Sequence, residues 1–252
     1  MSTRFKAGNP TLNPEIFQRQ AQEMAYGGSA ARMTVGGTMA KSALLLVIVI
    51  AMAAVGWVFF NPIVFFGALG VGLILGLVGF FMPKASPIIA PLYSVAMGYF
   101  VGAISMFATM NAPADWKGIV PVAVLATMVV FASMLALYTT RIIKVTQTFR
   151  MVVGGATLAI MLLYLGTFIT SFFWPGVSQL PIYTSGPIGI GFSLLVIGLA
   201  AFNLAIDFAN IEEGAQAGAP KYMEWYASFG LMVTIIWLYI EILRLLMKLQ
   251  NR

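Results

Sequence analysis

Long apolar segments, separated by short polar ones, make up most of this chain after a polar stretch at residues 1–41. A helix needs about 20 apolar residues to cross the hydrocarbon core of a bilayer. A backbone in lipid must satisfy its own hydrogen bonds, so each long apolar run predicts an α-helix. The pattern predicts seven spans, near residues 42–60, 62–82, 88–110, 118–139, 151–173, 186–208 and 228–247.

Composition supports a membrane protein. Of 252 residues, 60% are hydrophobic and only 9% are charged, whereas a soluble domain is about a quarter charged. We therefore predict an all-α polytopic membrane protein, with a polar N-terminal tail at residues 1–41 and a seven-helix transmembrane domain at 42–252. The chain has no Cys and no His. Proton chemistry must then use carboxylates or lysines, and we expect no cofactor.

The distribution of cations predicts the orientation of the chain. If the N-terminus is cytoplasmic, ten of the 14 Lys and Arg residues fall on the cytoplasmic side, as the positive-inside rule favours. Those ten are Arg4, Lys6, Arg19, Arg32, Lys41, Lys84, Arg141, Lys144, Arg150 and Lys221. The other four are Lys117, Arg244, Lys248 and Arg252. Three of these lie at the C-terminus, which is also typical of a cytoplasmic tail, so the side of the C-terminus stays open.

A polar stripe interrupts the sixth predicted span. Asn203, Asp207 and Asn210 have i, i+4 and i+7 spacing, which places them on one helix face. An ionisable side chain within a span is costly and usually faces the interior of the bundle or a water-filled cavity. The alternative is that Asp207 lies near the membrane surface, solvated with Glu212 and Glu213.

Two further carboxylates lie in the last predicted helix or just before it. Glu241 has apolar neighbours, but Arg244 and Lys248 on the same helix could neutralise it. Glu224 stands beside Trp225 and Tyr226, where the alternative is a solvated surface charge. Lys84 is a loop cation or a countercharge to a carboxylate on the cytoplasmic side.

Buried carboxylates in a bundle predict a proton-sensitive cation site. Two close carboxylates can share a proton. When that proton is lost, the remaining negative charge attracts a cation. Oxygen ligands such as these suit Ca²⁺. We predict Asp207, Glu241 and Glu224 as proton-sensing or gating groups, with Asp207 and Glu241 as metal ligands. Asn203, Asn210 and Glu213 would ligate or orient the ion.

The sequence shows no nucleophile–base set, no phosphate-binding glycine motif and no zinc-protease motif. We therefore do not expect an enzyme. The formal charge of +6 sets membrane orientation and does not indicate nucleic-acid binding.

Several segments resemble a bacterial branch of the Bax inhibitor-1-like family, the transmembrane Bax inhibitor motif proteins. They are "NPTLNPEIF", "MTVGGTMAKSALLL", "PLYSVAMGYFVGAISMF", "IDFANIEEG" and "APKYMEWYASFGLMVTIIWLYIEILRLLMKLQ". The resemblance implies two three-helix layers around a central seventh helix. It also implies a pH-sensitive Ca²⁺ leak for some members, and control of a membrane quality-control protease for another.

Asp207 and Glu241 match the family's acidic positions in the sixth span and the last helix. The gap between them is longer than the family's. A straight helix from about residue 220 would place Glu241 about 30 Å along its axis, too deep to meet Asp207 near the cytoplasmic face. Either residues 214–228 lie outside the membrane, or the partner of Asp207 is another residue such as Glu224. The family's basic cluster after the second span is reduced to Lys84.

The sequence thus predicts a multi-pass inner-membrane protein with a cytoplasmic N-terminus that mediates a pH-sensitive Ca²⁺ leak gated by buried carboxylates. Its partners would be the lipid bilayer and Ca²⁺ or protons. The alternative is a regulator that transports nothing and contacts a membrane protease, or another membrane partner, through its N-terminal tail.

Overall fold

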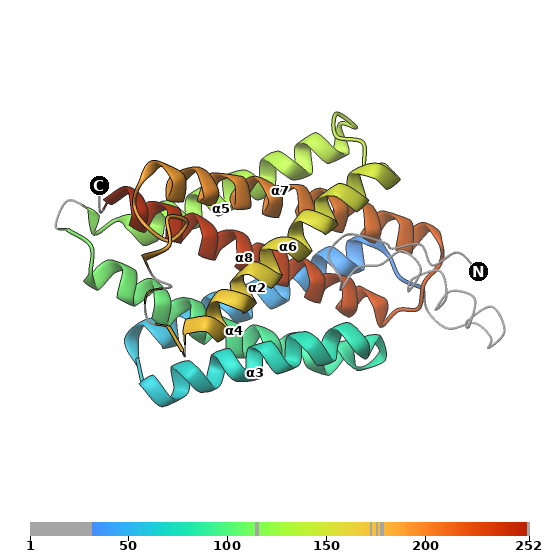
Figure 1. Ribbon diagram of the computed structural model, residues 1–252. Coiled ribbons are helices and arrows are strands. Elements are labelled where there is room, and N and C mark those ends of the chain that lie inside the picture. The colour runs from blue at the N-terminus through green and yellow to red at the C-terminus, as the bar shows by residue number, and fades with distance from the viewer. Residues whose placement is uncertain (1–31, 114–115, 172, 175, 177–178, 251–252) are drawn as a thin grey trace. The chain divides into compact units, whose positions relative to one another are not determined.

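Seven long helices account for most of the residues that the computed structural model describes, which are 32–113, 116–171, 173, 174, 176 and 179–250 (Figure 1). They are α2 (Val35–Val58), α3 (Pro62–Phe81), α4 (Ser86–Met110), α5 (Ile119–Thr139), α6 (Gln147–Ser171), α7 (Pro187–Gln216) and α8 (Met223–Gln250). A short 3₁₀ turn, η1 (Pro83–Ala85), precedes α4. All seven are long and apolar enough to cross a membrane. The predicted all-α polytopic class and the seven spans are confirmed.

Polar residues before the first apolar run belong to α2, which begins at Val35 rather than near residue 42. Thr34 has extended backbone angles, and its side chain accepts a hydrogen bond from the amide of Gly37. This N-cap satisfies a backbone donor that the first helical turn leaves free. Residues 1–31, which form most of the predicted polar tail, lie outside the described residues.

The predicted break at Asn61–Pro62 is confirmed. Asn61 caps α3, because its side chain accepts hydrogen bonds from the amides of Ile63 and Val64. Pro62 occupies the first helical position, where its missing N–H is not needed. One continuous helix through this region is thereby excluded.

The helices on either side of the last connection are longer than predicted. α7 continues to Gln216 instead of ending near residue 208, and α8 begins at Met223 instead of near residue 228. Gly218, with φ of 70°, ends α7. The amide of Gly218 donates a hydrogen bond to the carbonyl of Ala215, and the amide of Ala219 donates one to the carbonyl of Gly214. These two bonds form the Schellman pattern. Asp207 and Asn210 therefore lie within α7 and not at its end.

The described residues belong to two compact units. One contains residues 32–106 and 206–236, and the other contains 107–205 and 237–250. In the first unit, α2 and α4 approach closely: a Cβ on Gly98 would lie 2.7 Å from the carbonyl oxygen of Val49, and one on Gly102 would lie 1.9 Å from that of Ala53. Small residues permit such contact between membrane helices.

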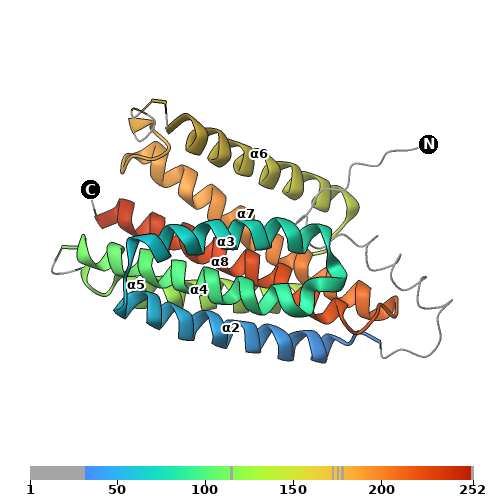
Figure 2. The same cartoon turned by 90° about the horizontal axis from the view of Figure 1, so that it is seen from below.

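In the second unit, aromatic pairs join α6 to α7. Phe149 and Phe202 pack edge to face with ring centroids 5.5 Å apart, and Tyr164 packs on Phe192 at 6.4 Å. Figure 2 allows each helix to be followed from a second direction. α4 and α8 are the most buried of the seven helices. The predicted arrangement of two layers around a central helix stays a prediction.

Candidate functional site

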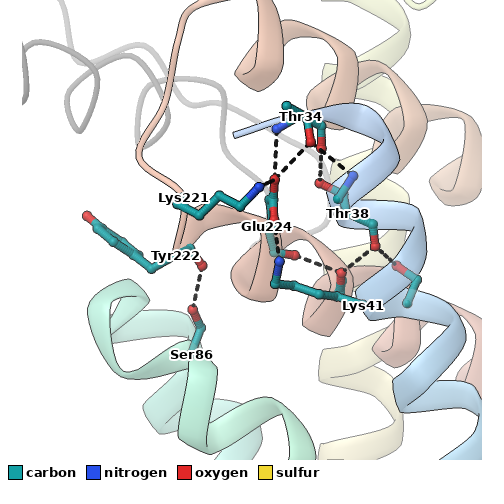
Figure 3. A network of polar contacts seen from close by, with 10 residues as sticks. Thr34, Thr38, Lys41, Ser86, Lys221, Tyr222 and Glu224 are labelled. Atoms are coloured by element: carbon teal, nitrogen blue, oxygen red, sulfur yellow. Dashed lines mark hydrogen bonds and ion pairs between the residues drawn. The ribbon is translucent and has the colours of Figure 1, made fainter. Parts of the chain in front are cut away.

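A buried carboxylate on the first turn of α8 collects the largest group of polar contacts drawn in Figure 3. Glu224 has no exposed surface. Its Oε1 accepts from the Thr34 amide at 2.9 Å, the Thr34 hydroxyl at 3.0 Å and the Lys221 ammonium at 2.9 Å. Its Oε2 forms an ion pair with Lys41. The interpretation of Glu224 as a solvated surface charge is wrong, because protein donors replace water around it.

Local sequence explains how α2 supplies these donors. Thr34 and Lys41 are seven residues apart, which places them on one helix face two turns apart. Gly37 lies between them, and a Cβ there would lie 2.2 Å from Oε1 of Glu224. Only a residue without a side chain allows the carboxylate to reach this face. The Lys41 ammonium also lies 5.5 Å from the centre of the Trp225 ring, a cation–π distance.

Neighbouring contacts extend this group to other segments of the same unit. The amide of Met33 donates to the carbonyl of Ala219 at 2.7 Å, beside an isolated bridge between Arg32 and Pro220. The hydroxyl of Ser86, at the start of α4, donates to the carbonyl of Tyr222 at 3.2 Å (Figure 3). The start of α2, the α7–α8 connection and the start of α4 therefore meet here.

Asp207 is fully buried within α7. Its Oδ2 accepts a hydrogen bond of 2.6 Å from the hydroxyl of Thr234 on α8. The alternative of an Asp207 solvated at the membrane surface is wrong, because the side chain has no exposed area. Glu213, six residues further along α7, is exposed instead.

Glu241 is also buried, with 1% of its surface exposed. The hydroxyl of Tyr164 on α6 donates to its Oε1 at 2.9 Å, and Nη1 of Arg244 contacts both carboxylate oxygens at 2.9 and 3.1 Å. Arg244 also lies 4.9 Å from the centre of the Tyr164 ring. The intrahelical ion pair considered from the sequence is thus present with Arg244.

Lys248, the second cation considered for Glu241, is buried at 6% exposure and donates to three neutral acceptors. These are the carbonyls of Ile182 and Gly189, at 2.7 and 2.9 Å, and the hydroxyl of Ser193 at 2.9 Å. An ammonium group has three donors, so each of them has a partner here.

Glu224, Glu241 and Thr234, the partner of Asp207, stand at separate positions along α8. Thr234, which binds Asp207, follows Glu224 by ten residues and precedes Glu241 by seven. At 1.5 Å per residue these intervals are about 15 Å and about 10 Å along the axis. Among the described residues, no three acidic side chains gather into a group that could hold a metal ion. Metal binding by Asp207 and Glu241 therefore stays a prediction.

The remaining predicted residues differ in their surroundings. Asn203 is 1% exposed, and its Nδ2 donates to the Thr157 hydroxyl at 2.8 Å and to the carbonyl of Leu199 at 2.9 Å. Its Oδ1 accepts no hydrogen bond from the part of the chain that the structure describes. Asn210 is fully buried on α7, and Lys84 is exposed in η1.

Sequence reasoning missed most of the partners of these carboxylates. Thr234, Tyr164 and Thr34 come from segments 27, 77 and 190 residues away from the groups they contact. Lys221 was detectable, because it stands three residues before Glu224 and such pairs face each other at the start of a helix.

Comparison with protein families identifies the chain. The family model described as Bax inhibitor 1 like matches residues 9–251, which is nearly the whole sequence. Comparisons with curated proteins and with solved structures found no match.

Proposed function

Since this chain belongs to the Bax inhibitor 1 like family, we propose that it mediates a pH-sensitive leak of a cation such as Ca²⁺, controlled by the buried carboxylate of Asp207. The protein is a multi-pass membrane protein with seven helices of spanning length. The proposal places it in the inner membrane with a cytoplasmic N-terminus, as the distribution of Lys and Arg favours. It includes no enzymatic step.

The supporting observation is the hydrogen bond between Asp207 and Thr234. A carboxylate with no exposed surface, on a helix long enough to span a membrane, is bonded to a neutral hydroxyl. Ionisable groups within spans usually mark ion or proton pathways. Glu241 and Glu224 are each paired with a cation, so a change of charge on either glutamate would disrupt an ion pair.

Thr234 gives the proton a structural consequence. An ionised Asp207 only accepts hydrogen bonds, so the Thr234 hydroxyl must donate to it. A protonated Asp207 can donate to that hydroxyl instead, which frees the Thr234 hydrogen for the carbonyl of Gly230 at 3.3 Å. The bond between α7 and α8 thus reverses direction when the proton is taken up. Loss of the proton also leaves a negative charge that attracts a cation.

Calcium flux into dye-loaded proteoliposomes tests this proposal. We expect a Ca²⁺ flux that differs between about pH 6 and about pH 8, because protonation of a carboxylate changes its charge and its hydrogen bonding. Asp207→Asn should remove the pH dependence because the amide has no titrating proton. Glu212→Gln is the matched control, since it makes the same change at a half-buried position of α7. Equal pH profiles for wild type and Asp207→Asn would contradict the proposal.

A second function is supported by the contacts at the start of α2, where the amide of Thr34 donates to Glu224 and that of Met33 donates to the carbonyl of Ala219 in the α7–α8 connection. We propose as the alternative a regulator of a membrane quality-control protease, or of another membrane partner, that acts through its N-terminal tail and transports nothing. Deleting residues 1–31 separates the two functions. A regulator should lose its effect on the partner, whereas a leak should keep its flux.

A further inference from the structure

The Glu224 network joins two parts of the chain that are far apart in sequence, and it does so through a charge that has no contact with solvent. We infer that Glu224 is an electrostatic latch, which holds the start of α2 against the α7–α8 connection and can adopt a closed or an open state. The regulatory part of this inference, that opening the latch alters the leak, rests on the proposed function. The latch itself does not.

The donors to Glu224 divide into two groups. The amide and hydroxyl of Thr34 and the ammonium of Lys41 belong to the start of α2. Lys221 belongs to the α7–α8 connection, three residues before Glu224. If the start of α2 moved away, the carboxylate would keep Lys221 and lose every α2 donor.

Burial gives the latch two states rather than a continuous range. The Glu224 side chain has no exposed surface, whereas those of Lys41 and Lys221 are 19% and 51% exposed. A buried charge that loses a partner is strongly unfavourable. Separation of α2 must therefore be accompanied by entry of water or by neutralisation of Glu224. Partial separation without either is the least stable arrangement.

The latch is coupled to the connection between α7 and α8. Met33 donates to the carbonyl of Ala219, and the hydroxyl of Ser228 on α8 donates to the carbonyl of Thr38 on α2 at 2.9 Å. Displacement of the start of α2 would break both bonds. α7 and α8 also carry Asp207 and Thr234, which belong to the same compact unit, so the latch acts on the two helices whose contact is proposed to control the leak.

Alternative roles for this network are weaker. A cation site at Glu224 would have to displace two lysines, and no group of three or more acidic side chains that could hold a metal ion forms within the described residues. A role limited to neutralising Glu224 does not explain why Thr34 supplies both its amide and its hydroxyl.

Hydrogen exchange of the full chain in lipid nanodiscs tests the latch directly. In wild type, the amides of Met33 and Thr34 should exchange slowly, since both are hydrogen-bonded. Glu224→Gln and Lys41→Met should each speed their exchange by about tenfold or more, the effect of losing one hydrogen bond to a charged group. Lys41→Arg keeps the cation and should retain slow exchange.

Controls distinguish the latch from general loss of structure. Lys144→Met makes the same change at an exposed position and should leave exchange at Met33 and Thr34 as in wild type. Exchange within α5 and α6 should stay constant in every variant. If Glu224→Gln does not fold, the comparison of Lys41→Met with Lys41→Arg decides the question. Unchanged exchange in Lys41→Met would overturn the latch.

Flux measurements on the same variants test the regulatory part. Faster exchange together with an altered Ca²⁺ flux supports control of the leak by the latch. Faster exchange with wild-type flux overturns that control but leaves the latch in place. Absence of flux from folded wild-type protein overturns the proposed function, and with it the control, whereas the exchange result still decides whether the latch exists.

Discussion

The hydroxyl of Thr234 donates a 2.6 Å hydrogen bond to the carboxylate of Asp207, and both side chains are buried. This contact joins α7 and α8 at a point between the two glutamates of α8. A proton on Asp207 would reverse the direction of the bond. Substitution of Thr234 therefore tests this contact as directly as substitution of Asp207 does.

Thr234→Val should destabilise the protein by about 1–3 kcal/mol, because it removes the hydroxyl donor and leaves the buried carboxylate without it. Thr234→Ser keeps the hydroxyl and should lose much less stability. Thermal unfolding in detergent measures both variants. In the flux assay, Thr234→Val should shift the pH profile and Thr234→Ser should preserve it. Identical behaviour of the two variants would show that the hydroxyl has no role.

Glu241 offers a second test, since a cation and a neutral hydroxyl both bind it. Arg244→Met should destabilise the protein by about 3 kcal/mol, because it leaves a buried carboxylate without its counterion. Tyr164→Phe removes one neutral donor and should cost about 1 kcal/mol. Thermal unfolding of the two variants gives the order. If Tyr164→Phe were the more harmful, the ion pair would not be the main partner of Glu241.

Lys248 fixes the segment that leads into α7. Its ammonium donates to the carbonyls of Ile182 and Gly189 and to Ser193. Lys248→Met should therefore accelerate proteolysis near residues 179–186, while Ser193→Ala, which removes one of three acceptors, should have a smaller effect. Limited proteolysis followed by mass spectrometry measures the cleavage. Equal cleavage in wild type and Lys248→Met would contradict this anchoring role.

The seven spans were predictable because each depends only on a local run of apolar residues. The start of α2 was not, since a helix through Gly36 and Gly37 depends on the Thr34 cap and on contact with Glu224. The burial of Asp207 could be predicted because Asn203, Asp207 and Asn210 share one helix face. The pair of Glu241 with Arg244 could be predicted because residues three apart are neighbours on a helix.

The partners from other helices could not be found in this way. Tyr164 and Thr234 are ordinary residues of apolar spans, and nothing in their local pattern indicates which carboxylate they contact. The surroundings of Glu224 could not be predicted for a related reason: an acidic residue beside Trp225 is typical of a membrane surface, but the α2 donors that bury it lie more than 180 residues away.

Gly72 and Gly76 on α3 have the four-residue spacing of small residues that is typical of tight helix packing, but the closest approach of two backbones lies elsewhere. A Cβ on Gly76 would meet the Tyr93 ring at 3.9 Å, an ordinary contact, and one on Gly72 would meet the flexible end of Met97 at 2.4 Å. At Gly98 and Gly102 on α4 the nearest opposing atoms are backbone atoms of α2, which cannot move aside as a side chain can. The local pattern of small residues does not show which of them face another backbone.

Gly102→Ala should therefore destabilise the protein by about 1–3 kcal/mol, the usual effect of overpacking, because the new methyl group would lie 1.9 Å from the carbonyl oxygen of Ala53. Gly70→Ala on α3 is the matched control: no atom lies within 4 Å of its Cβ position. Alanine is favoured over glycine within a helix by up to about 1 kcal/mol, so this variant should be neutral or stabilised. Thermal unfolding of the two variants in the same detergent compares the signs. A Gly102→Ala protein as stable as Gly70→Ala would mean that α2 and α4 do not approach as closely as the structure has them.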